Sequence, residues 1–194
     1  RDNASHFHTL YDSSRGVTKE IYANSDSQEA TQSEGLTSFT SDGFVVGNAV
    51  NVNTSSNSFV SWNWLANGAT TSSNSNGSIT STVQASATSG FSIVKYTGTG
   101  SAATIGHGLS SAPEWIMVKN LSQGDAWKVY HHKVASDPQT DYLVLNANAA
   151  IVDDATVWND TAPTSSVFSI GNHTDVNTNT ENYIAYCWNG VESF

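Results

Sequence analysis

The chain has 194 residues, of which 7 are Lys or Arg and 17 are Asp or Glu, giving a formal net charge of -10. With so few positive charges there is no basic face to neutralise a phosphate backbone, so nucleic-acid binding is not expected. A hydrophobic fraction of 38% with 10% aromatic residues is too apolar for a disordered chain, the single cysteine excludes an intrachain disulfide framework, and no apolar run reaches the roughly 18 to 20 residues of a membrane helix.

Short strands separated by turns are predicted along the chain. Its polar residues are mainly Ser, Thr, Asn and Gly, which serve turns, while Val, Thr and the aromatics suit pleated, half-buried surfaces. In chain order, the predicted strands are 44–47, 59–65, 79–85, 91–96, 114–120, 127–131, 142–146, 167–170 and 183–188. The helix candidates, 31–36 and 147–155, are too short for more than a turn of helix. The chain is therefore predicted to be all-β.

An internal repeat is the strongest pattern in the sequence. The stretch from Phe44 to Trp64 aligns without a gap on the stretch from Phe168 to Trp188, at a constant offset of 124 positions. The identical pairs are Phe44/Phe168, Gly47/Gly171, Asn48/Asn172, Val52/Val176, Asn53/Asn177, Thr54/Thr178 and Trp64/Trp188. A weaker match at offsets of 119 to 122 extends the repeat upstream. The unit is thus about 120 residues long, and the chain holds roughly one and a half copies.

Large side chains occupy alternate positions in the two matched strands. They are Val60, Trp62 and Trp64 in the first strand and Ile184, Tyr186 and Trp188 in the second. Such alternation is typical of sheets with one core-facing side, so the predicted fold is all-β, with antiparallel, jelly-roll-like β-sandwich modules in tandem. Trp62, Trp64, Tyr186 and Trp188 are accordingly expected in the cores of two similar sandwiches. Cys187 points to the opposite face and is expected to form no bond within the chain.

The repeat divides the chain into three parts. Residues 1–68 are interpreted as the C-terminal part of a first, incomplete β-sandwich repeat, residues 69–89 as a Ser/Asn/Gly-rich linker with a candidate strand, and residues 90–194 as a second repeat. The first copy contains no counterparts of the predicted strands 91–96 and 114–120. A sheet that lacks strands has an edge that pairs with others, so we expect preceding sequence of the same polypeptide, or a neighbouring subunit, to complete it.

Catalytic signatures are weak. Asp153 and Asp154 are adjacent, so they point to opposite faces of a strand or are solvated in a turn, which does not fit the two facing carboxylates of a glycan hydrolase. The sequence contains no G-x-S-x-G elbow, H-E-x-x-H helix or phosphate-binding P-loop. No catalytic residue is assigned, and the chain is expected not to be an enzyme.

One loop has the spacing of a cation site. Asp175, Asn177, Asn179 and Glu181 place oxygen-bearing side chains at alternate positions, which suits a hard cation such as calcium. The equivalent stretch of the first copy, 51–57, carries no carboxylate, and the loop lacks the glycine and the last acidic residue of an EF-hand. A polar hairpin loop is the favoured interpretation, and no cofactor other than calcium is left open.

Exposed aromatic rings are the remaining candidates for binding. Glycan-binding sandwiches stack sugar rings on exposed Trp or Tyr side chains, and the repeat leaves Trp115, Trp127 and Trp158 without a place in a core. We take these three as candidate glycan-binding residues, because one or two exposed rings per copy suffice for a weak lectin-like site.

Several stretches resemble a known module. They are GFSIVKYTGTGSAATIGHGLSSAPEWIMVKN from residue 90, then WKVYH, WNDTAPTSSVFSIG and YIAYCWNGVESF, with LYDSSRGVTKEIYANS and GLTSFTSDGFVVGN upstream. They closely resemble a tandem module of unknown function in tail-fibre and other virion structural proteins of marine and cyanobacterial phages. The resemblance covers essentially the whole chain in the same motif order. It implies a structural or adhesive part with no catalytic residues to carry over.

The expected function is that of a non-enzymatic structural protein of a virion, in a phage tail fibre or a related appendage or decoration, with host-surface adhesion as a second role. A carbohydrate-binding module or a subunit of an extracellular filament is the alternative. Expected partners are other copies of the chain or flanking repeats of the same polypeptide, and a host-surface glycan in the adhesive role, without nucleic acid or membrane insertion. The expected location is the virion or the extracellular space.

Overall fold

The computed structural model describes residues 6–191, and almost all of its regular structure is β-strand. The largest element is an eight-stranded sheet whose neighbouring strands all run antiparallel. In spatial order the strands are β13 (Val152–Asp153), β12 (Asp141–Val144), β11 (Lys128–His131), β10 (Trp115–Asn120), β15 (Asn182–Trp188), β8 (Phe91–Thr97), β7 (Ser81–Ser86) and β6 (Ser72–Asn74). The prediction of an all-β chain is confirmed.

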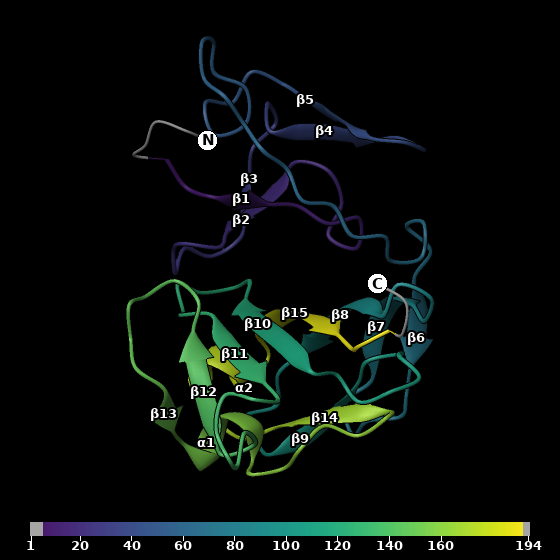
Figure 1. The fold of residues 1–194 in the computed structure, drawn as a ribbon, viewed down its shortest axis with the longest axis vertical. Coiled ribbons are helices and arrows are strands. Elements are labelled where there is room, and N and C mark those ends of the chain that lie inside the picture. The colour runs from purple at the N-terminus through teal and green to yellow at the C-terminus, as the bar shows by residue number, and fades with distance from the viewer. Residues whose placement is uncertain (1–5, 192–194) are drawn as a thin grey trace.

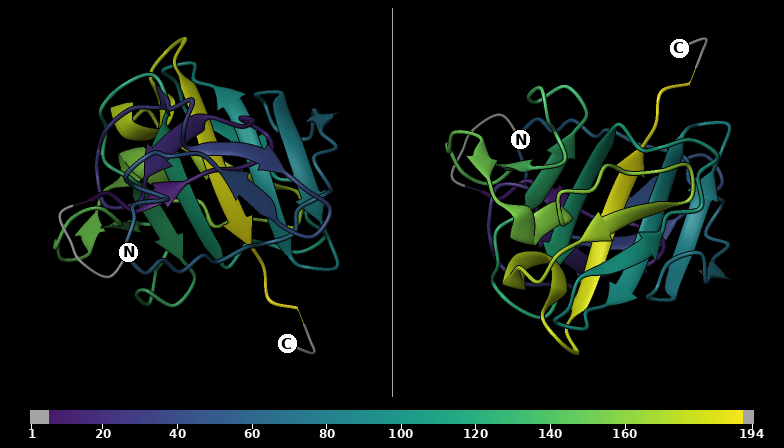
Figure 2. Two further views of the ribbon diagram at one scale, coloured as in Figure 1. Left: turned by 90° about the horizontal axis from the view of Figure 1, so that it is seen from above. Right: turned by 90° about the horizontal axis from the view of Figure 1, so that it is seen from below.

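Both faces of this sheet are covered. On one face lie a ribbon of β9 (Ala103–Gly106) and β14 (Val167–Ile170) and two single-turn helices, α1 (Ala155–Trp158) and α2 (Thr174–Asn177). The other face carries the N-terminal region, as Figures 1 and 2 show from three sides. That region contains β1 (Thr9–Leu10), β2 (Lys19–Tyr22) and β3 (Ala30–Thr31) in one small sheet, and β4 (Leu36–Phe39) and β5 (Phe44–Val46) in a hairpin.

The central strand β15 supplies side chains to two cores. Tyr183 and Cys187 belong to the core shared with β9, β14 and the helices, whereas Ile184 and Tyr186 belong to the core beneath the N-terminal region. The expectation of one core-facing side is therefore wrong for this strand. Because large residues alternate with small but still apolar ones, both of its faces can be buried. Cys187 is buried with a free thiol, and burial raises the pKa of that thiol to about 12.

Segment 59–65, predicted as a strand and as core, has no regular secondary structure and no strand partner in the described part of the chain. No strand within residues 6–191 pairs with it, and Trp62 is 72% exposed, although its counterpart Tyr186 in β15 is only 2% exposed. Trp64 is also exposed and Trp188 is half-buried, so of the four expected core aromatics only Tyr186 is fully buried. The physical reason is that β15 lies between β8 and β10, and segment 59–65 has no such neighbours.

Residues 69–89 do not behave as a linker. The candidate strand in this stretch is present as β7, which pairs with β8, and β6 pairs with β7 at the edge of the large sheet. Val83 contributes to the core shared with β9 and β14. The abundance of Ser, Asn and Gly in this stretch reflects its turns and its position at the sheet edge.

The small sheet of the N-terminal region has the same register as one end of the large sheet. Leu10 lies opposite Ile21 in the β1–β2 pair, and Val129 lies opposite Leu143 in the β11–β12 pair. The β2–β3 pair likewise matches the β12–β13 pair residue for residue at an offset of 122. Residues related by the weaker part of the sequence repeat therefore have the same strand pairing.

The turns of the two copies also match. The side-chain amide of Asn53 donates to the carbonyl oxygen of Gly47 at 2.8 Å, and that of Asn177 donates to Gly171 at 2.7 Å. The surroundings differ, however, because Asn177 is fully buried whereas Asn53 is exposed. The repeated residues thus share a local backbone structure in two different environments.

Candidate functional site

A row of aromatic side chains crosses one end of the large sheet. Trp115, Trp188 and Phe91 lie at one level across the adjacent strands β10, β15 and β8. The rings of Trp115 and Trp188 stack with centroids 4.7 Å apart, and Trp188 contacts Phe91 at 5.0 Å and Trp64 at 5.9 Å. We call these four residues the aromatic row. It joins segment 59–65 to the sheet.

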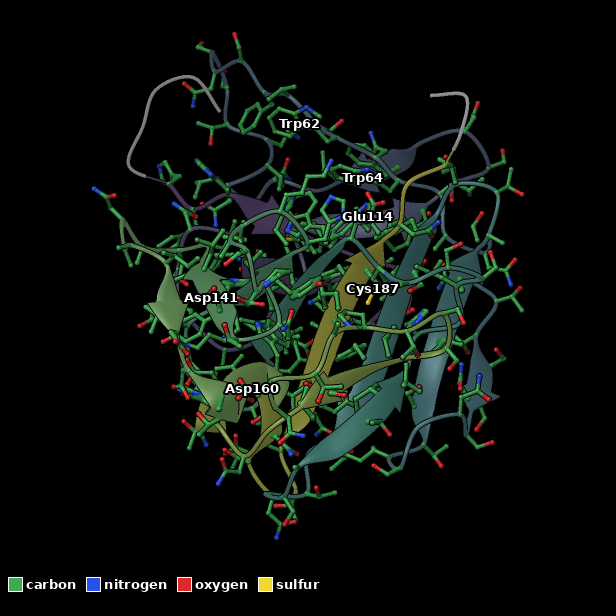
Figure 3. All side chains as sticks on the ribbon, turned by 60° about the horizontal axis from the view of Figure 1, so that its bottom comes forward. Trp62, Trp64, Glu114, Asp141, Asp160 and Cys187 are labelled. Carbon is green, nitrogen blue, oxygen red and sulfur yellow. The ribbon has the colours of Figure 1, made fainter. Side chains whose placement is uncertain are left out.

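The outer end of the row is accessible. Trp115 is 36% exposed, and Trp62 and Trp64 are more exposed still. Glu114 precedes Trp115, and its carboxylate lies 3.7 Å from the Nε2 atom of His132. In Figure 3, Trp62, Trp64 and Glu114 lie on the same side of the molecule, far from Asp160. Flat apolar rings beside a carboxylate can stack on the C–H face of a sugar and accept hydrogen bonds from its hydroxyl groups.

Two of the three predicted glycan-binding tryptophans cannot take part in such a surface. Trp127 has no exposed area, and its indole N–H donates to the carbonyl oxygen of Tyr22 at 2.8 Å beneath the N-terminal region. Trp158 is equally buried in the opposite core, edge-on to Tyr130. Both are core residues, Trp127 in the core beneath the N-terminal region and Trp158 in the core shared with β9 and β14. Only Trp115 of the predicted set presents a ring to solvent.

Three of the four predicted cation ligands make contacts with other residues of the chain. Asp175 forms an ion pair with Lys128 at 3.1 Å, and Glu181 accepts a hydrogen bond from the side-chain amide of Asn120. Asn177 is buried and holds the turn that follows β14, and Asn179 is exposed.

In the part of the chain that the structure describes, no three His, Cys, Asp or Glu side chains come together at one point. Asp154 caps α1 by accepting a hydrogen bond from the Thr156 amide, and hydrogen bonds from Thr156 lower its pKa.

A buried polar junction connects the N-terminal region to the sheet, and no sequence pattern predicts it. The Nε atom of Arg15 lies 2.5 Å from the carboxylate of Asp12, and the hydroxyl of Tyr186 donates to the same carboxylate at 2.6 Å. Burial raises the pKa of Tyr186 well above its usual value, and Asp12 adds to this while Arg15 opposes it. Nearby, Ser13 donates to the side-chain oxygen of Gln84. These contacts fix the N-terminal region over β15 and β7.

Lys119 on β10 makes a second junction. Its ammonium group is fully buried and donates to the carbonyl oxygens of Asp26, Asn120 and Asp125 at 2.9 to 3.0 Å. Burial lowers the pKa of Lys119 to about 8, although Asp125 and Asp26 oppose this shift. The residue ties the loop after β2 to the loop after β10, and no sequence signal marked it.

An open groove of about 530 Å³ lies along the same junction. Its lining includes Arg15, Lys19 and Lys95. The first two are paired with Glu29, at 3.4 and 3.8 Å, and Arg15 is also paired with Asp12. Because Arg15 and Lys19 are already paired with carboxylates of the chain, the groove is a weaker candidate for ligand binding than the aromatic surface.

Neither α1 nor α2 is long or apolar enough to cross a membrane, and they are the helices within residues 6–191. Comparison with curated proteins and with solved structures gives no significant match. A family model described as "Domain of unknown function (DUF7483)" matches residues 1–194. The chain therefore belongs to this family of uncharacterised domains.

Proposed function

We propose that the chain is a non-enzymatic structural module of a virion appendage, such as a phage tail fibre, and that it assembles there with further units of the same module. The virion location rests on the resemblance of the sequence to tail-fibre modules. The assembly rests on one structural observation, the unpaired and exposed state of segment 59–65.

Exposed apolar side chains in the N-terminal region support assembly, because the counterparts of Phe44 and Val60 in the second copy are buried. Phe44 on β5 is 40% exposed, whereas its counterpart Phe168 on β14 is 1% exposed against the large sheet. Val45, Val60 and Leu65 are also exposed. Large apolar side chains exposed in number are candidates for an interaction surface. We propose that the chain carries one and a half tandem β-sandwich units, of which the first is completed on assembly.

The location is tested on particles. Particles purified from a culture that produces the chain are digested and analysed by mass spectrometry, and intact particles are labelled with gold-conjugated antibody. The proposal expects the chain in the particle fraction, with label on an appendage. Recovery only from the particle-free supernatant, with unlabelled particles, would contradict it.

Adhesion to a glycan is a second candidate, favoured by the exposed ring of Trp115 beside Glu114. The test is a glycan array probed with the chain and with Trp115→Ala, using Leu145→Ala as a control at another exposed apolar residue. Adhesion predicts a glycan signal that Trp115→Ala abolishes and Leu145→Ala retains. An array without signal above background would exclude the tested glycans as receptors.

A further inference from the structure

We infer that segment 59–65 is an acceptor strand, completed by a β8-type strand on one edge and a β10-type strand on the other, both supplied by another unit of the same module. This inference rests on the proposed function and names the surface and the partner of the assembly.

The pairing of β15 in the same chain shows how such an acceptor strand is completed. β15 pairs with β8 from Asn182 to Trp188 and with β10 from Tyr183 to Trp188, antiparallel on both sides. Segment 59–64 is the counterpart of 183–188 at the offset of 124. The same register would place Trp64 between residues equivalent to Phe91 and Trp115.

Three segments of the N-terminal region with open edges are counterparts of strands that pair with one contiguous segment. β15 pairs with β8 and β10, β14 pairs with β9, and β11 pairs with β10. Their counterparts in the N-terminal region are segment 59–65, β5 and β1, and within residues 6–191 each of these has a free edge. Residues 90–120 contain β8, β9 and β10 together. A single donor segment of this type would therefore pair with all three segments, which a sugar or an unrelated apolar surface does not do.

The acceptor is preorganised by the turn that precedes it. The amide of Asn57 donates to the carbonyl oxygen of Thr54 at 3.3 Å, and Glu181 makes the same bond to Thr178 at the same distance. Ser56 and Thr180 both have positive φ, 65° and 68°.

In the complete copy this turn receives the end of β8. Gly98 donates to the carbonyl oxygen of Glu181 at 2.8 Å and accepts from the amide of Thr180 at 2.9 Å. The turn at 54–57 thus has the backbone conformation that binds a β8-type strand in the second copy.

The exposed side chains on the acceptor fit this partner. Val60 and Trp62 are exposed, while their counterparts Ile184 and Tyr186 are buried. An unpaired segment with exposed apolar side chains is the kind of edge that proteins protect or use for strand addition. Completion would bury these residues in the way that β15 is buried.

The test adds a synthetic peptide of residues 90–120 to the full chain. Binding is measured by calorimetry, and amide hydrogen exchange is followed by mass spectrometry. We expect a 1:1 complex in which exchange at 59–65 and 44–46 slows at least tenfold, with no change for a scrambled peptide.

Two proline variants make the test specific. Ser61→Pro removes a ladder donor from the acceptor and should weaken peptide binding at least tenfold. Ser55→Pro is the matched control, because position 55 precedes the positive-φ residue of a turn, where proline is tolerated. Equal binding by both variants would place the peptide elsewhere and overturn the inference.

A second measurement avoids the free peptide and so remains informative if the peptide self-associates. A chain with a copy of residues 67–120 joined ahead of residue 1 should protect 59–65 in a monomer. Rapid exchange at 59–65 in this chain, or protection in the unmodified chain through dimerisation of its own 59–65 segments, would overturn the inference. The virion location would stand or fall separately, on the particle analysis.

Discussion

β15 and segment 59–65 have related sequences but differ in strand pairing and in burial. β15 is a central strand of an eight-stranded sheet and is buried on both faces, whereas segment 59–65 has no strand partner within residues 6–191 and is exposed. Both have large side chains at alternate positions, and both follow a turn with the same backbone hydrogen bonds. The comparison shows that an alternating pattern makes a segment able to form a strand. Whether it pairs depends on strands from distant parts of the sequence.

The largest expected effect separates the two segments directly. Tyr186→Ala should lower the free energy of unfolding by about 3 to 5 kcal/mol, the range for truncating a large buried aromatic, and it also removes the hydrogen bond to Asp12. Trp62→Ala, at the equivalent position, should change it by less than about 0.5 kcal/mol. Chemical denaturation of both variants measures the difference. Similar losses in the two variants would show that segment 59–65 is packed in solution.

A second comparison concerns glycines at equivalent turns. A Cβ atom at Gly171 would overlap the carbonyl oxygen of Thr156, and one at Gly47 would come within 2.7 Å of the carbonyl oxygen of Glu34. Gly171→Ala should cost about 2 to 3 kcal/mol and Gly47→Ala about 1 to 2 kcal/mol, because each added methyl group strains a packed backbone contact. Thermal denaturation checks both values. A neutral Gly47→Ala would mean that the N-terminal turn is looser than its counterpart.

Replacing Asn177 should reduce stability more than replacing its counterpart Asn53. Asn177 donates to two carbonyl oxygens, those of Gly171 and Ser101, and is fully buried. Asn177→Ala should therefore cost about 2 kcal/mol, since the buried carbonyl oxygen of Gly171 loses its donor, and Asn53→Ala about 0.5 kcal/mol. On addition of the residue 90–120 peptide, the cost of Asn53→Ala should rise toward that of Asn177→Ala. An unchanged cost would separate the turn from the acceptor surface.

The smallest expected effect is a pH dependence at Lys119. Burial lowers the pKa of Lys119 to about 8 in the folded chain, below its ordinary value of 10.5. Between these values the unfolded chain binds more protons, so this residue makes stability rise as the pH increases from about 8 to 10. Lys119→Met should reduce that slope, and Lys133→Met, at an exposed lysine, should retain it. Denaturant unfolding at several pH values tests this, and equal slopes in the two variants would contradict it.

The sequence predicts local backbone structure well, but it predicts strand pairing and burial poorly. Residues 91–96 and 183–188 were recognised as strands because apolar side chains are dense there, and the repeat between 44–64 and 168–188 has a structural counterpart in shared turns and pairings. Segment 59–65 was expected to pair because its pattern is that of β15, but pairing depends on strands distant in sequence. Trp127 was placed on the surface for the same reason, since the region that covers it begins more than a hundred residues earlier.

The candidate site was found only in part. Trp115 was identified as an exposed ring, whereas Trp62 and Trp64 were assigned to a core. Arg15 and Lys119 would ordinarily be surface residues, and their burial follows from carbonyl and carboxylate groups that the fold brings together. The sequence repeat identified segment 59–65 as the counterpart of β15, and the structure adds that this segment has no strand partner within residues 6–191.

The position of β15 between β8 and β10 has a kinetic consequence. The strands on either side form two groups, β6 to β8 and β10 to β13, in which each strand pairs with its neighbour along the chain. Such local pairs close short loops and form early, whereas β15 must join strands from which it is separated by long stretches of chain. Pulse-labelled hydrogen exchange should therefore show β7, β8, β10 and β11 protected before β15. The two groups are expected to remain separate half-sheets until β15 pairs with β8 and β10. The rate of folding is therefore expected to be limited by the pairing of β15.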